Sequence, residues 1–249
     1  VGAGADLAGG VAGDGERQVE RRIAHPYVGR RGCDQFSPLH NRIGQHFGAQ
    51  VINDLLVGFK YHADVLARLE STGQYGDVRG SLEDFVIATE ESHGVLVTPE
   101  IRDKDSAGAA LLLAEAALDQ KRRQSTLPAL LAELHRRFGY FRNELRNIAL
   151  TGVEGKQQMQ RMMDQLRRSP PARIAGWNVS RFEDLLDEQG RLGPYQGDTD
   201  RAARNFLVFL LQGDRGMTGK ICLRPSGTEP KAKAYFEVST PPCPPELSE

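Results

Sequence analysis

The segment Arg224 to Lys231 reads Arg-Pro-Ser-Gly-Thr-Glu-Pro-Lys, a set of residue types that suits the binding of an oxyanion. Gly227 lets neighbouring backbone N–H groups turn toward one point, and Ser226 and Thr228 add hydroxyl donors. The Arg224 guanidinium offers a planar pair of donors that matches a phosphate. The other interpretation is a polar turn between two strands, because most clusters of Gly, Pro and Ser are turns.

A second group of polar residues, Glu90 to Gly94, directly follows a predicted strand. Glu90 and Ser92 are two residues apart, so in extended backbone they face the same side. A carboxylate beside a hydroxyl can bind two vicinal hydroxyls of a sugar, and Gly94 permits a close approach of the ligand. Taken alone, the segment also fits a strand end that continues into a solvated acidic turn.

Basic residues stand at two predicted helix starts. Arg102 and Lys104 precede an Ala-rich helix, where positive charge opposes the helix dipole. An anionic or hydroxyl-rich ligand nearby would explain their presence. Lys60 follows Gly58 at a strand-to-helix junction, which is a weaker indication of a binding site.

The elements that must position these residues follow from the spacing of apolar side chains. The first half is predicted to contain helices over His40 to Phe47, Phe59 to Glu70, Ser106 to Lys121 and Leu127 to Phe138, and strands over Ala49 to Val57 and Asp84 to Ala88. Asp105 or Ser106 is expected to cap the third of these helices. Alternating strands and helices favour a three-layer α/β domain.

The pattern changes after Tyr140, and a domain boundary is expected near residue 142. The second half is predicted to contain one helix over Gly155 to Arg168 and strands over Leu145 to Leu150, Ile174 to Phe182, Asn205 to Leu211, Lys220 to Leu223 and Ala232 to Val238. Gln212 to Gly219 is expected to connect two strands as a hairpin. These elements describe a smaller α+β domain with a mostly antiparallel sheet.

Composition limits the class of protein. The chain has 249 residues and a formal net charge of −1 at pH 7, which gives no argument for nucleic acid or an anionic membrane surface as a partner. Cys33, Cys222 and Cys243 are widely spaced, which favours a reducing compartment over a disulfide framework or a zinc site. No apolar run has the length of a membrane span. We therefore expect a soluble, cytoplasmic protein.

Four segments, taken together and in order, resemble the α-D-phosphohexomutase superfamily, which includes the phosphoglucomutases and phosphomannomutases. They are Gly58 to Tyr61, Glu90 to Gly94, Arg102 to Asp105 and Arg224 to Lys231. The likeness runs from about His46 to Val238. Family members have four domains, and this chain resembles the third and the fourth.

The resemblance divides the chain into four parts. Residues 37–142 correspond to the third domain, and residues 143–240 correspond to the fourth domain without its C-terminal helix. Residues 1–36, rich in Gly, Ala and Arg, match nothing in the family and are expected to be disordered or mis-joined. Residues 241–249 form a Pro-rich tail.

The resemblance also implies roles for single residues. Glu90 and Ser92 belong to the sugar-binding loop, Lys60 contacts the substrate, and Lys104 contacts the substrate and assists proton transfer. The residues implied to bind phosphate are Arg224, Ser226, Gly227, Thr228 and Lys231.

The implied reaction moves a phosphoryl group between two positions of a hexose. A phosphoserine gives its phosphoryl group to the sugar phosphate, and the resulting hexose 1,6-bisphosphate turns over and returns its other phosphate to the serine. Positioning and charge stabilisation carry most of such a transfer. The family's nucleophile and its Mg²⁺ lie in the first and second domains, so no metal ligand is assigned in this chain and an N-terminal catalytic half is expected to be missing.

Two segments imitate the loops of that catalytic half. Ser37 to Asn41 contains a Ser, a His and an Asn, but Leu39 stands where the nucleophile would be. Asp198 to Arg201 imitates the magnesium loop, but it follows the sugar loop instead of preceding it. The pair Thr199 and Asp200 is better interpreted as a helix or turn cap. Neither segment is assigned a catalytic role.

Three hypotheses remain open at this point. The leading one is the substrate-binding half of a phosphohexomutase, which binds hexose phosphate and is inactive alone. The alternative is a non-catalytic sugar-phosphate binding or regulatory module, and the third is a pair of structural domains without a ligand. The residues do not distinguish glucose from mannose, because the two sugars differ at a single hydroxyl.

Overall fold

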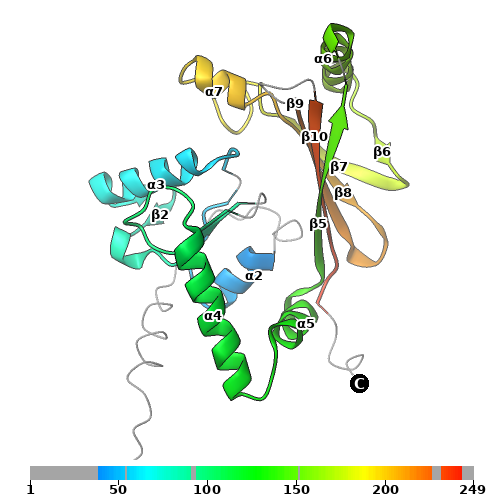
Figure 1. Cartoon of the computed structure of the whole chain (residues 1–249). Coiled ribbons are helices and arrows are strands. Elements are labelled where there is room, and N and C mark those ends of the chain that lie inside the picture. Colours follow the sequence, from blue (N-terminus) through cyan, green and yellow to red (C-terminus); the bar gives the residue numbers. More distant parts are fainter. Residues whose placement is uncertain (1–38, 54, 91–93, 151, 226–230, 243–249) are drawn as a thin grey trace, which may run out of the picture.

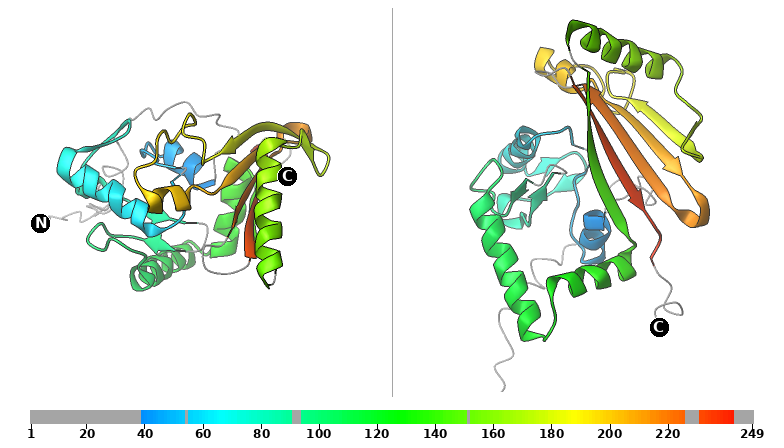
Figure 2. Two further views of the ribbon diagram at one scale, coloured as in Figure 1. Left: turned by 90° about the horizontal axis from the view of Figure 1, so that it is seen from above. Right: turned by 45° about the vertical axis from the view of Figure 1, so that its right-hand side comes forward.

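The computed structural model describes residues 39–53, 55–90, 94–150, 152–225 and 231–242. A mostly helical part, residues 39–138, lies beside a part built on one large antiparallel sheet (Figure 1 and Figure 2). This arrangement of helices and strands confirms the α/β class. Ser92, Ser226, Gly227, Thr228 and the first predicted segment, 1–36, lie outside the described residues. Within the described ranges, no helix combines the length and the apolar character needed to cross a membrane.

The large sheet has six strands in the order β5-β10-β9-β8-β7-β6, and each neighbouring pair is antiparallel. The strands are β5 (Phe141–Ala149), β6 (Arg173–Ile174), β7 (Trp177–Asp184), β8 (Leu207–Gln212), β9 (Thr218–Pro225) and β10 (Lys231–Ser239). The β8–β9 connection contains a short 3-10 helix, η3 (Asp214–Gly216). The predicted antiparallel sheet and its hairpin connection are therefore confirmed.

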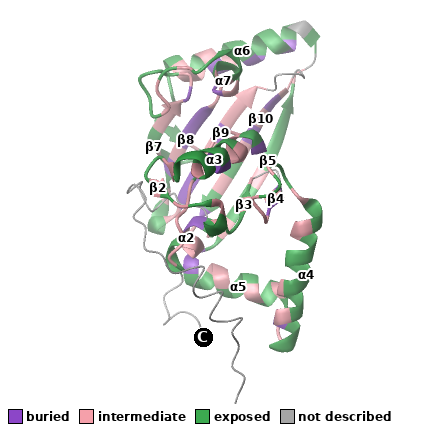
Figure 3. Cartoon of the chain, turned by 90° about the vertical axis from the view of Figure 1, so that its left-hand side faces the viewer, coloured by how far each residue is buried: buried purple, intermediate pink, exposed green. Residues whose placement is uncertain are grey.

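Helix α6 (Gly152–Arg168) packs on one face of this sheet, and the hydrophobic core of the second part lies between the helix and the sheet. Met163 is fully buried against Leu207, Phe209 and Leu211 of β8. Each such side chain contributes about 1.5–3 kcal/mol when it is fully buried. Purple, the colour of burial in Figure 3, concentrates on the central strands, whereas α4 (Ser106–Arg122) is mostly green and exposed.

The prediction of one strand over Ile174 to Phe182 was wrong. The chain turns back at Ala175 and Gly176, and β6 pairs with β7 as a tight hairpin. Both residues have positive φ, 49° and 85°, as a type I′ turn requires. The alternating apolar pattern continues across this turn, so it gives no sign of the reversal.

The predicted helices of the first part are all present. They are α2 (Leu39–His46), α3 (Phe59–Thr72), α4 (Ser106–Arg122) and α5 (Leu127–Phe138). Asp105 caps α4 by accepting a hydrogen bond from the Ala107 amide at 3.0 Å, as predicted. Helix α3 ends at Gly73, whose φ of 67° is the left-handed conformation that glycine adopts without strain.

The two strands predicted in the first part were wrong. Residues 49–53 and 55–57 form no ladder, and the Gln50 side chain instead bonds both backbone groups of Arg79, at 2.7 and 3.1 Å. At the second position, Ser81 and Asp84 bond each other and start a 3-10 helix, η2 (Leu82–Asp84). In both segments a side chain bonds backbone groups of a neighbouring segment, those of Arg79 and Ser81.

The sheet content of the first part is two short antiparallel pairs. They are β1 (Gln74–Tyr75) with β2 (Val78–Arg79), and β3 (Ala88–Thr89) with β4 (Val95–Leu96). The helices pack around these pairs through a core of Phe59, Leu66 and Leu96. In the described residues of this part, the helices therefore pack on two-stranded ladders.

Arg42 of α2 ties the two parts together. Its guanidinium donates to the Phe138 carbonyl at 2.8 Å, reaches the Thr240 carbonyl at 3.4 Å and lies 4.8 Å from the centre of the Phe141 ring. Strand β5 begins at Phe141. The domain boundary near residue 142 stays a prediction.

Candidate functional site

Glu90 and Gly94 lie together beside the first residue of α3. The Glu90 amide donates to the Gly94 carbonyl at 3.0 Å. A Cβ atom at position 94 would lie 2.4 Å from Cε2 of Phe59 and 2.9 Å from Oε1 of Glu90, so only glycine fits. Gly94 therefore permits the contact between the predicted sugar-binding segment and the start of α3.

Lys104 joins the same group of residues. Its ammonium lies 5.8 Å from the centre of the Phe59 ring and 3.0 Å from the Asp103 carboxylate. The hydrogen bond from Lys104 holds the pKa of Asp103 below its usual value. The Lys104 side chain is 61% exposed, so it is accessible from solvent.

The other basic residue at the start of α4 has a partner within the chain. Arg102 pairs with Glu70 of α3 at 2.8 Å. Arg102 and Lys104 are therefore each balanced by a carboxylate, which explains their place before α4 without a ligand. The structure brings Glu90, Gly94 and Lys104 close to α3 and leaves their predicted roles untested.

Lys60 lies in a cleft of about 400 Å³ where the two parts of the chain meet. One side of the cleft is the first turn of α3, with Lys60, Tyr61 and Asp64. The other side is the segment 196–200, which leads into α7 (Asp198–Ala203). The cleft thus connects a predicted substrate residue of the first part with the second part.

Tyr61 and Asp200 face each other across this cleft. The Tyr61 hydroxyl is buried and has no hydrogen-bond partner among the described residues. Burial raises the pKa of the Tyr61 phenol, the Asp200 charge adds to this rise, and Arg204 partly offsets it. Burial would also raise the pKa of Asp200, but hydrogen bonds from Arg204 and the Gln196 amide, with the Lys60 charge, hold it below its usual value.

Arg204 fixes the shape of the segment that forms the far wall of the cleft. It is 3% exposed and pairs with Asp200 at 2.7 Å. It also donates to the Gly193 carbonyl at 2.6 Å and stacks on the Tyr195 ring at 5.3 Å. Truncation of the side chain at position 204 would remove all of these contacts.

Arg224 and Lys231 stand at the adjoining ends of β9 and β10. Arg224 pairs with Lys233 across the two strands, so both side chains start from the same face of the sheet. The Arg224 Nε atom is buried and has no hydrogen-bond partner in the described part of the chain. An unpaired buried guanidinium N–H is costly, so this atom is suited to donate to a ligand.

Tyr61, Asp200 and Arg204 were missed as parts of a site. Thr199 and Asp200 were predicted as a helix or turn cap, but the N-cap of α7 is Gly197, without a side-chain cap hydrogen bond, and Asp200 lies within the first turn of the helix. The partners lie far apart in the sequence, and no spacing rule links α3 with α7.

The described residues do not fit a magnesium site. The Asp200 carboxylate is bound by Arg204 and by the Gln196 amide, at 2.9 and 3.0 Å. Across the described ranges, no group of three or more His, Cys, Asp or Glu side chains could hold a metal ion.

The known proteins to which this chain is similar include phosphoglucomutases. A phosphoglucomutase of Staphylococcus haemolyticus is 33% identical over 192 residues, which cover 76% of this chain and 32% of the relative. One from Staphylococcus aureus is 31% identical over the same shares. The chain thus spans about a third of the length of these curated relatives. No model of a protein family matches the chain.

Among solved structures, the open form of the exocytosis-sensitive phosphoprotein pp63/parafusin, a phosphoglucomutase from Paramecium, overlays with a TM-score of 0.48 at 13% identity. The overlay covers 84% of this chain and 32% of the parafusin chain. The identity to the curated relatives, together with the four ordered motifs, carries the assignment. The chain belongs to the phosphohexomutase superfamily and corresponds to the C-terminal part of its members.

Proposed function

We propose that this chain is the substrate-binding part of a phosphoglucomutase-type enzyme, which interconverts hexose 1-phosphate and hexose 6-phosphate. Glu90, Ser92, Lys60 and Lys104 contact the sugar. The phosphate that is not reacting is held by Arg224, Ser226, Gly227, Thr228 and Lys231.

The reaction proposed for the whole enzyme exchanges one P–O bond for another. A sugar hydroxyl attacks the phosphorus of a phosphoserine, the bond from phosphorus to the serine oxygen breaks, and the hydroxyl proton passes to a base. The bisphosphate then returns its other phosphoryl group to the serine. Neither the nucleophilic serine nor an Mg²⁺ loop is assigned in this chain, so it supplies positioning and positive charge only.

The observation that carries the proposal is the placement of the predicted residues. Glu90 and Lys104 lie near the start of α3, and the next residue of that helix, Lys60, lines a cleft against the second part. In the second part, Arg224 keeps a buried donor without a protein partner among the described residues. A hexose phosphate has hydroxyls that can bind Glu90, Lys60 and Lys104, and a phosphate dianion that can bind Arg224.

Calorimetric titration of the chain with glucose 6-phosphate tests this proposal. We expect binding that Arg224→Gln weakens by about tenfold to a hundredfold, because a hydrogen bond to a charged group contributes about 1.5–3 kcal/mol. Arg136→Gln on the exposed surface of α5 is the matched control and should leave the affinity unchanged. Equal affinity of the Arg224 variant and the wild type would refute the phosphate-binding role.

A coupled assay separates the substrate-binding part from a complete enzyme. We expect no conversion of glucose 1-phosphate by the 249-residue chain alone, since no phosphoryl donor is assigned in it. Turnover by the pure chain would contradict this expectation. Binding of glucose 6-phosphate by a chain that never acts with a catalytic partner would favour a regulatory module.

A further inference from the structure

A second cavity, of about 690 Å³, lies between α6 and α7 at the end of the large sheet. Its volume falls in the range of small-molecule sites. The residues that define its chemistry are Lys156, Gln160, Leu186, Arg201, Asn205 and Pro225. None of these residues belongs to the sugar- or phosphate-binding groups proposed above.

The register of the sheet separates this cavity from Arg224. Pro225 pairs with Ala232, and Arg224 pairs with Lys233. Neighbouring residues of a strand project to opposite faces. Pro225 and the fully buried Ala232 face α6, so the Arg224 side chain starts on the other face of the sheet. A ligand between α6 and α7 is therefore distinct from one held by Arg224.

The cavity carries a net positive charge. Lys156 and Arg201 are both exposed, and neither forms a salt bridge with another described residue. The Arg201 guanidinium lies 5.6 Å from the centre of the Tyr195 ring, which restricts its position. Asp198 supplies one opposing carboxylate at the rim shared with the Lys60 cleft.

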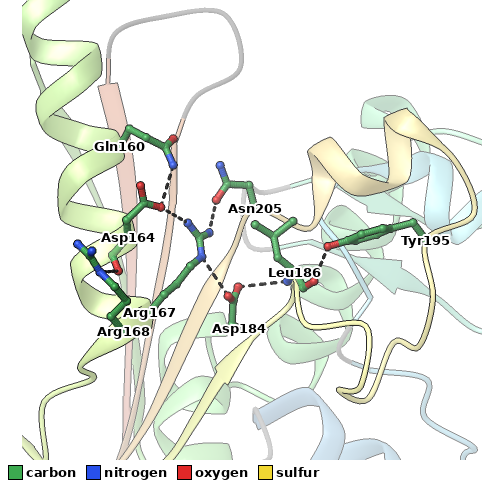
Figure 4. Close-up of polar contacts among 8 residues, drawn as sticks. All are labelled: Gln160, Asp164, Arg167, Arg168, Asp184, Leu186, Tyr195 and Asn205. Carbon is green, nitrogen blue, oxygen red and sulfur yellow. Dashed lines mark hydrogen bonds and ion pairs between the residues drawn. The ribbon is translucent and has the colours of Figure 1, made fainter.

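Two of the amide side chains that line the cavity, Gln160 and Asn205, are held by hydrogen bonds to neighbouring residues (Figure 4). Asp164 accepts a hydrogen bond from the Gln160 amide nitrogen at 2.9 Å. Arg167 pairs with Asp184 at 3.0 Å and donates to the Asn205 amide oxygen. The Gln160 oxygen and the Asn205 nitrogen remain for a ligand, and neither side chain must be reordered when it binds.

We propose that this cavity is a second anion site, which binds the phosphate of a small phosphorylated polyol. Lys156, Arg201 and the Asn205 amide hold the phosphate. The Gln160 oxygen and the Asp198 carboxylate accept hydrogen bonds from the hydroxyls of the polyol. Leu186 and Pro225 form an apolar wall against its carbon chain.

Titrations of the whole chain with glucose 6-phosphate and, separately, with inorganic phosphate test the proposal. Wild type should bind two equivalents of glucose 6-phosphate. The double variant Lys156→Gln/Arg201→Gln should lose about tenfold or more in the affinity of one binding event and keep the event that Arg224→Gln weakens. Inorganic phosphate should bind this cavity more weakly, because it has no hydroxyls that reach Gln160 and Asp198.

The matched control is Lys121→Gln/Arg136→Gln, which removes the same charge from α4 and α5 and should leave both events intact. If the double variant fails to fold, Gln160→Glu provides the test, because a carboxylate beside the bound phosphate should abolish the same event. A single equivalent that the cavity variants leave unchanged, or two equivalents of unchanged affinity in the cavity variants, would overturn the second site. A single equivalent that the cavity variants remove and Arg224→Gln leaves unchanged would overturn only the function proposed above.

Discussion

Arg204 allows the most direct test of how the cleft wall is built. The side chain is buried, and its guanidinium contacts Asp200 at 2.9 and 2.7 Å and the carbonyls of Gly193 and Pro194 at 2.6 and 3.3 Å. We expect Arg204→Ala to destabilise the protein substantially, since it leaves a carboxylate and two carbonyls without their donor.

The magnitude follows from the burial of both partners. Removing one partner of a buried ion pair costs about 3–5 kcal/mol. The Asp200 side chain is 19% exposed and keeps its bond from the Gln196 amide, so part of its charge stays solvated and satisfied. We therefore expect a loss at the lower end of that range, about 3 kcal/mol.

Equilibrium urea unfolding of Arg204→Ala and wild type measures this loss. The matched control is Arg68→Ala, because Arg68 also pairs with an Asp four residues away in a helix, but the pair is about half exposed, at 52% and 47%. An exposed pair of this kind contributes less than about 1 kcal/mol. A stability loss for Arg204→Ala no larger than that of Arg68→Ala would refute the argument.

Two further predictions concern buried polar groups. Asn41→Leu should stabilise the protein by about 1 kcal/mol or more in urea unfolding, because the Asn41 amide is fully buried with neither polar atom bonded in the described structure; a loss of stability would contradict this. The pKa of Asp200 is lowered in the folded protein. The contribution of this carboxylate to the free energy of unfolding is therefore complete above its unfolded pKa of 3.8, and it is lost as the pH falls through its folded pKa. Asp200→Asn should therefore weaken the protein at pH 7 and make its stability less sensitive to acid below pH 4, and an unchanged acid profile of unfolding would count against this assignment.

The sequence was a good guide where local signals and packing agree. Helix α5 has the predicted bounds because Thr126 caps its start and Gly139 follows its last residue, Phe138. The central strands of the large sheet were also predicted, since continuous apolar runs such as Leu207 to Leu211 have no exposed side.

Prediction from the sequence failed where the structure of a segment depends on a partner that lies elsewhere in the chain. Alternation over Ala49 to Val57 predicts two faces, yet no neighbouring strand pairs with the described residues of this segment, and Gln50 bonds Arg79 through its side chain. The same limit applies to the cleft. Motif order identified the family, whereas the meeting of Tyr61 with Asp200 depends on how two distant helices dock.

The two cavities are connected by the segment that Arg204 holds. Asp198, at the start of α7, lines both the Lys60 cleft and the cavity between α6 and α7. A ligand that moves α7 in one cavity therefore changes a wall of the other. Thermodynamic linkage then requires the effect to be reciprocal: if an anion at Arg201 alters hexose-phosphate affinity at the cleft, hexose phosphate must alter anion affinity by the same factor. Arg204→Ala should abolish this coupling even in conditions where the protein remains folded, because the shared wall loses the contacts that hold it as one unit.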